Sequence, residues 1–437
     1  MKKIFGPLLF IANIAIVTTF WWNFSGELML TGEINSQFLA ISRLAGLLAT
    51  QLALVQLILI GRIKWVESVF GLDKLSRIHK WNGYLVLSLI ILHVILVTKA
   101  YSVFNGASYI SQYVSFLIDY DDVFKAFLAY LILLGTVGLS ITIIRRKLKY
   151  EYWYYVHILN YITFVLFVGH QLELGMSSQS STFQLYWLAT YIFTAGHISW
   201  FRFIKPILNF TKHEFTISKV QTEGPATSIF ISGKNLNTFK RQAGQFMILR
   251  FIQKSFWYEA HPFSLSWGAD NEQLRITAKN LGDYTAKMPL LKVGTKVLID
   301  GPHGVFTSSK IKKEKVLMIA GGIGITPIRS LVEELAGTID LTIIYSVKTQ
   351  AEAILLSELK NIKSQRAFNL IEIYSAEKVA GSEFGMLDKV KLNSLVPDLK
   401  DRDVFLCGPP PMMNALKIAM QELGLPNKQL HWERFAL

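Results

Sequence analysis

Four histidines lie at regular intervals inside two long apolar segments of the chain. His79 and His93 are 14 residues apart, and His157 and His170 are 13 residues apart. A spacing of 14 residues places two side chains within about 40° of one another around a helix and about 21 Å apart along it. Imidazoles are axial ligands of haem iron, and a coordinating side chain inside a membrane segment indicates a functional site. The pattern predicts two stacked b-type haems, one between His79 and His157 and the other between His93 and His170.

The second pair fits a regular helix less well than the first. A spacing of 13 residues leaves a remainder of about 220° around the helix. The segment that carries His157 and His170 must therefore tilt, kink or change its winding, or its two rings must approach their irons from different directions. The alternative interpretation is that the four histidines only bond neighbouring helices. A fifth histidine, His197, has no partner at a matching spacing, and we expect it to be structural.

Basic residues near these histidines are candidates for holding haem propionates. Arg77, Lys80 and Lys149 could do so beside the inner pair, although anchoring at the membrane surface explains them equally well. Arg43 lies several residues inside an apolar segment, near its outer end, where a charge costs a few kcal/mol. It could extend to the surface, but we favour a partner for the outer haem propionate or for an anionic product.

Two motifs in the C-terminal half suit a flavin. HPFSLS at 261–266 pairs a ring with a hydroxyl, so that Phe263 could pack on an isoalloxazine and Ser264 could bond its polar edge. Alone, this is also the pattern of a core strand. LGDYT at 281–285 opens a short helix, whose N-terminus could bind a pyrophosphate through Gly282 and Thr285, and DGPHG at 300–304 makes a tight turn. The candidate flavin-binding residues are His261, Pro262, Phe263, Ser264, Gly282, Tyr284 and Thr285.

A third motif, GGIGITP at 321–327, lies between a predicted strand and a predicted helix. Its glycines would let a nucleotide phosphate approach the backbone, and Pro327 suits the first helical position. The next strand ends in YSVK at 345–348 and lacks the acidic residue that usually binds a ribose hydroxyl. Ser346 and Lys348 suit a 2′-phosphate, which favours NADPH over NADH. The candidate nucleotide-binding residues are Gly321, Gly322, Gly324, Thr326, Pro327, Ser346, Lys348, Cys407, Gly408 and Pro409.

Two further residues are candidates for roles beside the nicotinamide. Cys407 opens the sequence CGP at the end of a later strand, where open parallel sheets bind ligands. Its thiol could lie by the nicotinamide, or it could be a buried structural cysteine. Phe435, two residues before the end, could stack on the flavin until nicotinamide displaces it, or could be part of ordinary terminal packing.

The histidines require helices that cross a membrane. The chain of 437 residues is 51% apolar and only 17% charged, against about 25% charged in ordinary soluble proteins. Apolar runs at about 4–22, 38–60, 81–98, 124–144, 153–172 and 183–204 each reach the roughly 17–25 residues that a span needs. We expect the first run to remain as a helix rather than to be removed as a signal peptide.

Lysines and arginines between these runs lie mostly on one side of the membrane, which predicts that this side is cytoplasmic. Six crossings would then place both the N-terminus and everything after residue 205 in the cytoplasm. The opposite loops contain only Lys99 and Lys125. The residues on the cytoplasmic side are Lys2, Lys3, Arg62, Lys64, Lys74, Arg77, Lys80, Arg145, Arg146, Lys147, Lys149, Arg202 and Lys205.

The C-terminal half has a different texture. Short β-type runs between about 214 and 300, separated by Gly and Pro, indicate a small antiparallel barrel. Beyond about 312, strands alternate with helical patterns, which indicates a parallel sheet. We therefore expect domains at 1–205, 206–310 and 311–437. The net charge is +14, but the basic residues of this half are dispersed, so we expect no nucleic-acid partner. The single cysteine excludes internal disulfides, Cys-ligated iron–sulfur clusters and a c-type haem attachment.

These residues together resemble the NADPH oxidase and ferric reductase superfamily, over nearly the whole chain, and look closest to its bacterial NADPH oxidases. The two histidine spacings and the motifs HPFSLS, GDYT, GGIGITP and CGP match the family. Arg43 stands where animal oxidases carry an arginine beside the outer haem. The resemblance implies a multidomain fold: a six-helix transmembrane haem-binding bundle, then a β-barrel FAD-binding domain and an α/β nucleotide-binding domain of the ferredoxin–NADP reductase type.

The sequence also departs from that family. Val97 replaces a further histidine of the animal oxidases, which weakens the case for specialised oxygen chemistry. His261 replaces the arginine that begins the flavin motif of soluble reductases, as in the oxidase branch. Ala436 and Leu437 follow the terminal aromatic residue.

The resemblance implies transmembrane electron transfer from cytoplasmic NADPH, with NADH possible, through FAD and two b-type haems to oxygen, producing superoxide. Arg43, Cys407 and Phe435 would then act at the reacting groups. A ferric-chelate reductase with the same relay is one rival, and an electron-transfer subunit that donates to a protein partner is another. We expect a multi-pass protein of the plasma membrane. No obligatory activating subunit is expected, since the chain has no calcium loop and no Pro-rich docking tract.

Overall fold

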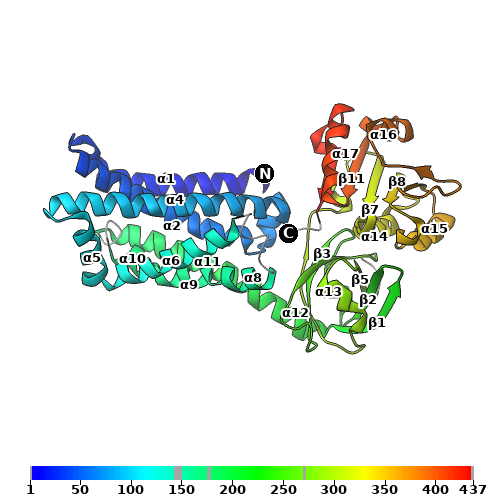
Figure 1. Cartoon of the computed structure of the whole chain (residues 1–437), viewed down its shortest axis with the longest axis horizontal. Helices are drawn as coiled ribbons and strands as arrows, with labels where there is room; N and C mark the ends of the chain where they lie inside the picture. The colour runs from blue at the N-terminus through cyan, green and yellow to red at the C-terminus, as the bar shows by residue number, and fades with distance from the viewer. Residues whose placement is uncertain (1, 142–149, 175–178, 269–271, 435–437) are drawn as a thin grey trace. The chain divides into compact units, whose positions relative to one another are not determined.

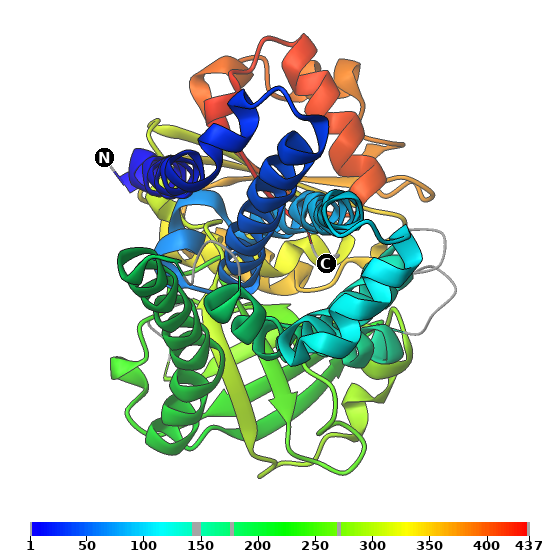
Figure 2. The ribbon, with the colours of Figure 1, turned by 90° about the vertical axis from the view of Figure 1, so that its left-hand side faces the viewer.

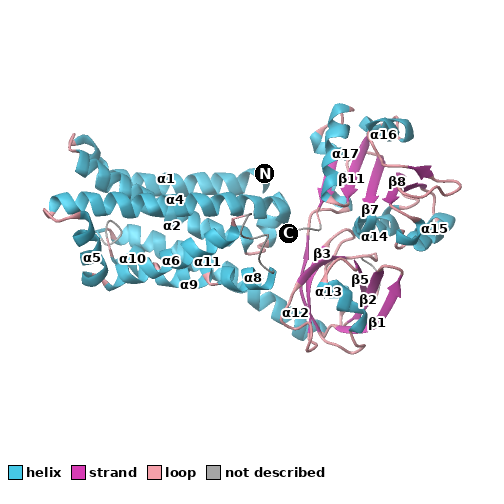
Figure 3. Cartoon of the chain, viewed as in Figure 1, coloured by secondary structure: helices cyan, strands magenta, loops and turns pink. Residues whose placement is uncertain are grey.

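The computed structural model describes residues 2–141, 150–174, 179–268 and 272–434. The chain divides into two compact units, Met1–Phe70 with Lys74–Phe201, and Gly71–Asp73 with Arg202–Leu437. The first unit is built of helices, whereas the second combines strands with helices (Figure 3).

Four helices among the described residues are long and apolar enough to cross a membrane. They correspond to the first four apolar runs of the sequence. Side-chain hydroxyls fix the start of two other helices, since Ser108 accepts a hydrogen bond from the Ser111 amide and Ser180 accepts one from the Phe183 amide. The helices of this unit are α1 (Lys2–Leu30), α2 (Ile34–Ile60), α3 (Lys64–Phe70), α4 (Leu72–Phe104), α5 (Tyr109–Asp119), α6 (Asp121–Ser140), α8 (Tyr150–Ile158), α9 (Asn160–Leu166), α10 (Val168–Glu173) and α11 (Ser181–Ile198).

The fifth and sixth predicted spans are not single long helices. The fifth run is divided into α8, α9 and α10, and the sixth consists of α11 followed by a short π-helix, Ser199–Ile204. Both runs nevertheless belong to the bundle, because α9 and α10 pack against α6 and α11 packs against α2. Figures 1 and 2 show α1, α2, α4, α6 and α11 running alongside one another in this unit.

Large aromatic side chains fill the interior between α1, α2 and α11. Phe183, Trp187 and Tyr191 recur every four residues on α11 and pack with Val17 of α1 and Leu47 of α2. A recurrence of four residues keeps side chains on one face of a helix. Many other apolar side chains of the unit point outward, such as Leu8, Ile11 and Ile192, as expected for helices in a lipid environment.

The second unit begins with α12 (Lys205–His213) and two three-stranded antiparallel sheets. Isolated bridges join Thr216 to Lys296 and Leu265 to Ile276, and one apolar core is shared by both sheets. The short helix α13 (Asp283–Lys287) precedes the last of these strands. The sheets are β1 (Thr216–Glu223), β2 (Ala226–Ser232) and β5 (Leu274–Lys279) in the order β1-β2-β5, and β3 (Phe246–Phe251), β4 (His261–Ser264) and β6 (Val297–His303) in the order β4-β3-β6.

The rest of the second unit is the α/β part that the alternating pattern predicted. Its six strands are all parallel, in the order β10-β9-β8-β7-β11-β12, and helices cover the sheet (Figure 1). The strands are β7 (Lys315–Gly321), β8 (Asp340–Val347), β9 (Asn369–Tyr374), β10 (Glu383–Phe384), β11 (Arg402–Cys407) and β12 (Leu430–Glu433), and the helices are α14 (Ile325–Leu335), α15 (Leu356–Gln365), α16 (Lys389–Leu395) and α17 (Pro410–Glu422).

Candidate functional site

The structure brings together the two histidine pairs that the spacing predicted. The ring centroids of His79 and His157 are 6.0 Å apart, and those of His93 and His170 are 6.2 Å apart. An imidazole nitrogen lies about 1.1 Å from its ring centre and a metal–imidazole bond is about 2.0–2.1 Å, so two imidazoles that share one metal have centroids about 6.2 Å apart. Each pair is therefore spaced to hold one metal between its rings. Their role as haem ligands stays a prediction.

A change of helical winding lies between His157 and His170. The segment that carries His157 and His170 is interrupted at Leu159 and at Phe167. The Leu159 amide donates to the carbonyl of Val156, and the Ile162 amide donates to that of Leu159, so both bonds span three residues rather than four. Such bonds wind the chain more tightly than an α-helix does. The predicted irregularity of this segment is therefore observed.

Backbone carbonyls of α2 orient the two histidines of α4. Nδ1 of His79 lies 3.1 Å from the carbonyl oxygen of Gln56, and Nδ1 of His93 lies 2.8 Å from that of Ser42. A carbonyl can only accept, so Nδ1 of each ring donates and Nε2 keeps its lone pair for a metal. The side-chain amide of Gln56 also donates through Nε2 to the His79 carbonyl at 2.9 Å and accepts through Oε1 from the Asn82 side chain at 2.7 Å.

Gly46 makes room for the ring of His93. A Cβ atom at Gly46 would lie 2.9 Å from Nδ1 of His93, closer than a van der Waals contact. Gly46 follows Ser42 by one helical turn, so the same face of α2 supplies both the hydrogen-bond acceptor and the space. The sequence reasoning missed Gly46, Ser42 and Gln56 because their roles arise from contacts between helices.

The partners of the other two histidines differ from these. His157 stacks on Trp153 with centroids 4.9 Å apart, and its Nδ1 is 3.4 Å from Oγ of Ser140, which accepts a bond from the Trp153 indole at 3.0 Å. Nδ1 of His170 is buried and has no hydrogen-bond partner within the described ranges. The two predicted iron sites therefore have different surroundings.

Arg43 lies one residue from Ser42, on the part of α2 that contacts His93. Its guanidinium donates to Oγ of the buried Ser25 at 3.2 Å. Arg77 and Lys80 are exposed on α4, and Lys149 lies outside the described residues. His197 is half-buried, bonds the Phe193 carbonyl at 2.9 Å and packs on neighbouring rings, which agrees with a structural role.

Two buried hydroxyls without partners lie in the predicted flavin site. Ser264 Oγ and Tyr284 OH form no hydrogen bond within the part of the chain that the structure describes. Tyr284 packs on His261, with centroids 4.0 Å apart, and stacks on Phe263. Burial, together with the charge of Glu259, raises the pKa of Tyr284, so that its hydroxyl stays protonated. Buried hydroxyls usually find a partner, so these two are positioned to bind a polar ligand such as the edge of a flavin.

The remaining flavin candidates are arranged differently from the prediction. The Thr285 hydroxyl accepts hydrogen bonds from the amides of Leu281 at 3.0 Å and Gly282 at 3.1 Å, and so caps α13. Of the donors that we expected to bind a pyrophosphate, the Gly282 amide is thus used within the turn, and the Thr285 hydroxyl donates to the Gly282 carbonyl at 3.1 Å. A pyrophosphate that bound at this helix N-terminus would have to replace the hydrogen bonds that these groups form within the turn. Pro262 lies in β4 beside His261.

The glycine-rich turn has a packing role that the sequence did not reveal. A Cβ atom added to Gly324 would lie 2.2 Å from the Cys407 carbonyl oxygen. A Cβ atom added to Gly321 would lie 2.5 Å from Sδ of Met412. A Cβ atom at Gly408 would lie 3.0 Å from Cα of Gly321, so this turn packs tightly on the loop that begins with Gly408 and Pro409. In contrast, Gly322 has φ +52° and open space around it. It is therefore the glycine of this turn that a phosphate could approach.

Four other nucleotide candidates lie on the same motif or at the end of the neighbouring strand. Thr326 is buried and its hydroxyl donates to the Ile323 carbonyl at 3.1 Å. Pro327 is the third residue of α14 rather than the first, because the helix begins at Ile325. Proline is tolerated there since amides of the first turn have no partner within the helix. At the end of β8, Ser346 is half-buried and Lys348 is exposed.

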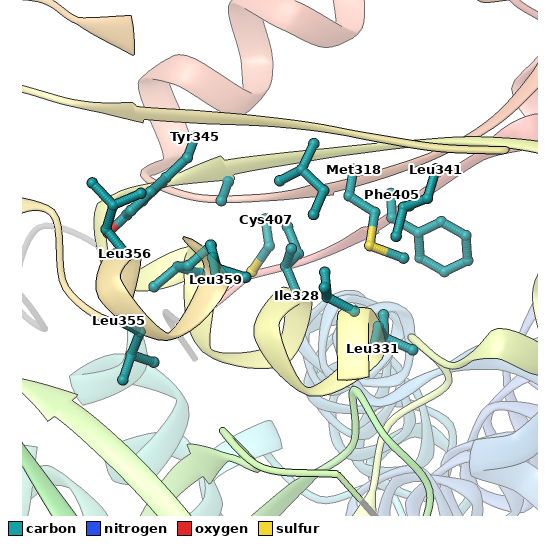
Figure 4. Close-up of a cluster of buried hydrophobic side chains, with 14 of the residues drawn as sticks. Met318, Ile328, Leu331, Leu341, Tyr345, Leu355, Leu356, Leu359, Phe405 and Cys407 are labelled. Carbon is teal, nitrogen blue, oxygen red and sulfur yellow. The ribbon is translucent and has the colours of Figure 1, made fainter. Parts of the chain in front are cut away.

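The structure places Cys407 in an apolar cluster. The residue is fully buried, and its neighbours in the cluster include Ile328, Tyr345 and Leu359 (Figure 4). Burial, above all, raises the pKa of the Cys407 thiol. This placement agrees with a structural cysteine, and its role by the nicotinamide stays a prediction. Phe435 lies outside the described residues.

A network of ion pairs links β5 to α14 and α15. The buried Arg275 donates two hydrogen bonds to Glu358, at 2.6 and 2.9 Å, and Arg329 donates to the same carboxylate at 2.8 Å. Arg329 also pairs with Glu333. Burial opposes ionisation of Glu358, but the hydrogen bonds and charges of the two arginines outweigh it and lower its pKa. The network holds the antiparallel sheets against the parallel-sheet part of the unit.

Comparison with protein families assigns three segments of the chain. Residues 45–168 match the family described as "Ferric reductase like transmembrane component". Residues 228–307 match a FAD-binding domain, and residues 318–417 match an oxidoreductase NAD-binding domain. The fold and the matches define a membrane-associated oxidoreductase with flavin- and NAD(P)-binding domains. Its architecture is that of the NADPH oxidase and ferric reductase-like proteins.

Two curated relatives match less than half of the chain at about 30% identity. The chain is 33% identical over 172 residues to the glycine betaine monooxygenase reductase subunit of Chromohalobacter salexigens, covering 37% of this chain and 46% of the relative. It is 29% identical over 198 residues to the ferredoxin reductase component of the 3-ketosteroid-9-alpha-monooxygenase of Mycobacterium tuberculosis, covering 44% and 54%. The chain thus spans about half the length of these relatives.

Solved structures align with part of the chain at low identity. The flavohem-like FAD/NAD-binding domain of the nitric oxide dioxygenase of Vibrio cholerae aligns with a TM-score of 0.46 and 23% identity, covering 50% of this chain and 97% of that one. A ferredoxin NADP+ reductase of Neisseria gonorrhoeae aligns with a TM-score of 0.46 and 20% identity, covering 52% and 99%.

Proposed function

We propose that the chain moves electrons from cytoplasmic NADPH across the membrane to oxygen, producing superoxide. The observation that carries this proposal is the spacing of the two histidine pairs, at 6.0 and 6.2 Å between ring centroids. Two such pairs on shared helices suit a path for single electrons between the two membrane surfaces. The overall reaction balances as NADPH and two O₂ giving NADP⁺, two superoxide ions and one proton.

Three kinds of group would be bound for this chemistry. When bound, FAD would accept a hydride and release single electrons, and two b-type haems would carry them. His79 with His157 would hold the inner haem, and His93 with His170 the outer haem. Ser264 and Tyr284 would bond the flavin through their free hydroxyls. The chain's remaining contributions are to orient these groups and to exclude water from them.

The nucleotide would bind at the carboxyl ends of the parallel strands, where open α/β sheets bind ligands. The open side of Gly322 would admit a phosphate, and Ser346 with Lys348 would bind the 2′-phosphate that distinguishes NADPH from NADH. Cys407 and Phe435 would lie near the nicotinamide. Arg43 would neutralise a propionate of the outer haem or attract the superoxide anion.

The proposed arrangement in the membrane has six crossings. The four candidate helices would be joined by the segment α8–α10 and by α11, which pack within the same bundle. Both the N-terminus and the C-terminal unit would be cytoplasmic at the plasma membrane. The two bridged antiparallel sheets would form the FAD-binding barrel within 206–310, and 311–437 would form the NAD(P)-binding domain.

The test is NADPH oxidation by the purified full-length protein with a single acceptor. We expect steady oxidation in oxygen, with reduction of cytochrome c that superoxide dismutase suppresses, and no need for calcium or a second protein. Fast turnover with a ferric chelate and almost none with oxygen would instead assign a ferric-chelate reductase.

A second candidate function has support from the relatives. Two of them are a reductase subunit and a ferredoxin reductase component of monooxygenases, and they match 37% and 44% of this chain. The chain could therefore donate electrons to a protein partner instead of to oxygen. Turnover that appears only after a membrane extract is added would favour this candidate.

A further inference from the structure

The second unit exposes four large apolar side chains on two neighbouring loops. Ile252 and Trp257, on the loop after β3, are 47% and 58% exposed. Leu290 and Val293, on the loop before β6, are 68% and 67% exposed. Soluble surfaces rarely group such side chains without a partner to cover them.

These loops are firmly held rather than loosely packed. The side chain of Gln253 joins them, because it donates to the Leu290 carbonyl at 3.1 Å and accepts from the Lys292 amide at 3.0 Å. Phe256 and Leu291 are buried in the core below, next to the exposed Trp257 and Leu290. The loops thus anchor some apolar residues inside and present others outward on a fixed platform.

The charged side chains exposed on these loops and at the end of α13 are lysines, whereas the one acidic residue of the loops, Glu259, is half-buried and pairs with His261 at 2.8 Å. Lys254, Lys287, Lys292 and Lys296 are all exposed. The sequence contains no Asp or Glu between Glu223 and Glu259, nor between Asp283 and Asp300. We call the surface made of Ile252, Trp257, Leu290, Val293 and these four lysines the Trp257 face.

The Trp257 face adjoins the point where the chain enters the second unit. Phe215 and Ile217 follow α12 directly, and they exchange backbone hydrogen bonds with Val297, Gly294 and Thr295 at 2.8–2.9 Å. The helix α12 follows the apolar segment that ends at residue 204, and it exposes Ile207 at 56% and Leu208 at 50%. Within the second unit, exposed apolar residues of α12 therefore precede the strand that pairs with these loops.

We propose that the Trp257 face binds the surface of the bilayer through anionic lipid headgroups. Tryptophan and aliphatic side chains would enter the boundary between headgroups and acyl chains, and lysines would pair with lipid phosphates. The pairing of an apolar cluster with exposed lysines fits an anionic membrane better than it fits a second copy of this basic chain. The proposal does not depend on the electron acceptor.

Site-directed spin labelling of the full-length protein tests this proposal. The only native cysteine, Cys407, is buried, so a nitroxide can be placed at Leu290→Cys, with Val293→Cys as a second site. The matched control is Val390→Cys on α16, where the native side chain is 78% exposed. Accessibility of each label to oxygen and to a water-soluble nickel chelate is measured in nanodiscs of phosphatidylcholine alone and with phosphatidylglycerol.

We expect the labels at positions 290 and 293 to be shielded from the nickel chelate in the anionic nanodiscs, and the label at 390 to stay accessible in both. The variants Lys254→Gln and Lys292→Gln should each lower about fivefold the ratio of molecules whose Trp257 face is bound to the membrane to molecules whose face is free. High salt should lower the same ratio. Labels at 290 and 293 that are as accessible as the one at 390 would overturn the proposal. So would dipolar coupling between two labels at 290, which would show a second copy, or shielding that persists unchanged in detergent.

Discussion

The variant Gly46→Ala tests whether His93 is held as a metal ligand. The new Cβ would lie 2.9 Å from Nδ1 of His93, whereas apolar contacts begin at about 3.5 Å. The ring would therefore have to move by about 0.6 Å, which is about three times the ±0.2 Å tolerance of a metal–ligand distance. The move would also stretch the 2.8 Å hydrogen bond to the Ser42 carbonyl, which contributes about 1 kcal/mol.

We expect Gly46→Ala to impair the outer haem and spare the inner one. The purified protein should hold about one haem per chain, or two with a weakened low-spin signal from one of them. Haem content by the pyridine haemochrome method and electron paramagnetic resonance of the oxidised protein measure this result. Overpacking of this kind costs about 1–3 kcal/mol, so the protein should still fold.

Gly135→Ala is the matched control, because α6 leaves open space at this position. It adds the same methyl group to a helix of the same unit and should change neither the haem content nor the spectrum. Two unaltered low-spin haems in Gly46→Ala would refute the reasoning, since His93 would then not be constrained by α2.

Three further predictions concern the second unit. Lys348→Ala should raise the KM for NADPH about tenfold and leave the KM for NADH unchanged. An equal rise for both nucleotides would mean that the 2′-phosphate binds elsewhere. Glu358→Gln should destabilise the unit by about 2 kcal/mol, measured as earlier thermal release of flavin, because it leaves Arg275 buried with a weakened partner. The pKa of Glu358 is lowered in the folded chain. The stability that its carboxylate adds is therefore present above the ordinary pKa of about 4.3 and is lost as the pH falls through the lowered pKa. Wild-type protein that kept its full stability through that pH range would contradict this. Ser264→Ala should reduce flavin retention without lowering the melting temperature of the flavin-free protein, because its hydroxyl has no partner within the described residues; unchanged retention would remove it from the site.

The histidine pairs could be predicted from the sequence because their geometry follows from helical periodicity and from membrane depth. The 14-residue spacing keeps two side chains on one face of a single helix, whichever helices surround it. The supports of these rings could not be predicted in the same way. Ser42, Gly46 and Gln56 act through contacts between α2 and α4, and nothing in their local sequence distinguishes them from other residues of an apolar helix.

The nucleotide motifs show the same division between local and long-range effects. The strand–turn–helix around GGIGITP was predicted correctly, since Gly and Pro punctuate it locally. The packing role of Gly321 and Gly324 was not predicted, because it depends on the end of the neighbouring strand β11 and the loop that follows Cys407. Likewise, the local sequence of the turn after β8 does not reveal its contact with Glu377, whose carboxylate accepts from the Gln350 backbone amide at 2.8 Å.

The features of the fold that depend on composition were predicted correctly, and those that depend on packing were predicted less well. The change from apolar helices to mixed strands and helices follows from hydrophobicity and turn residues. The division of the fifth run into three short helices was expected only as an irregularity, because the carbonyls and amides that rebond at Leu159 cannot be identified from hydropathy. The ion pairs of Arg275 with Glu358 join residues 83 positions apart and leave no local signal.

The most direct test of the central claim is the anaerobic addition of NADPH to the purified full-length protein, followed by oxygen. Haem content should be near two per chain, both haems should be reduced by NADPH, and oxygen should reoxidise both with formation of superoxide. A haem content near one, or haems that stay oxidised while NADPH is consumed, would contradict the account.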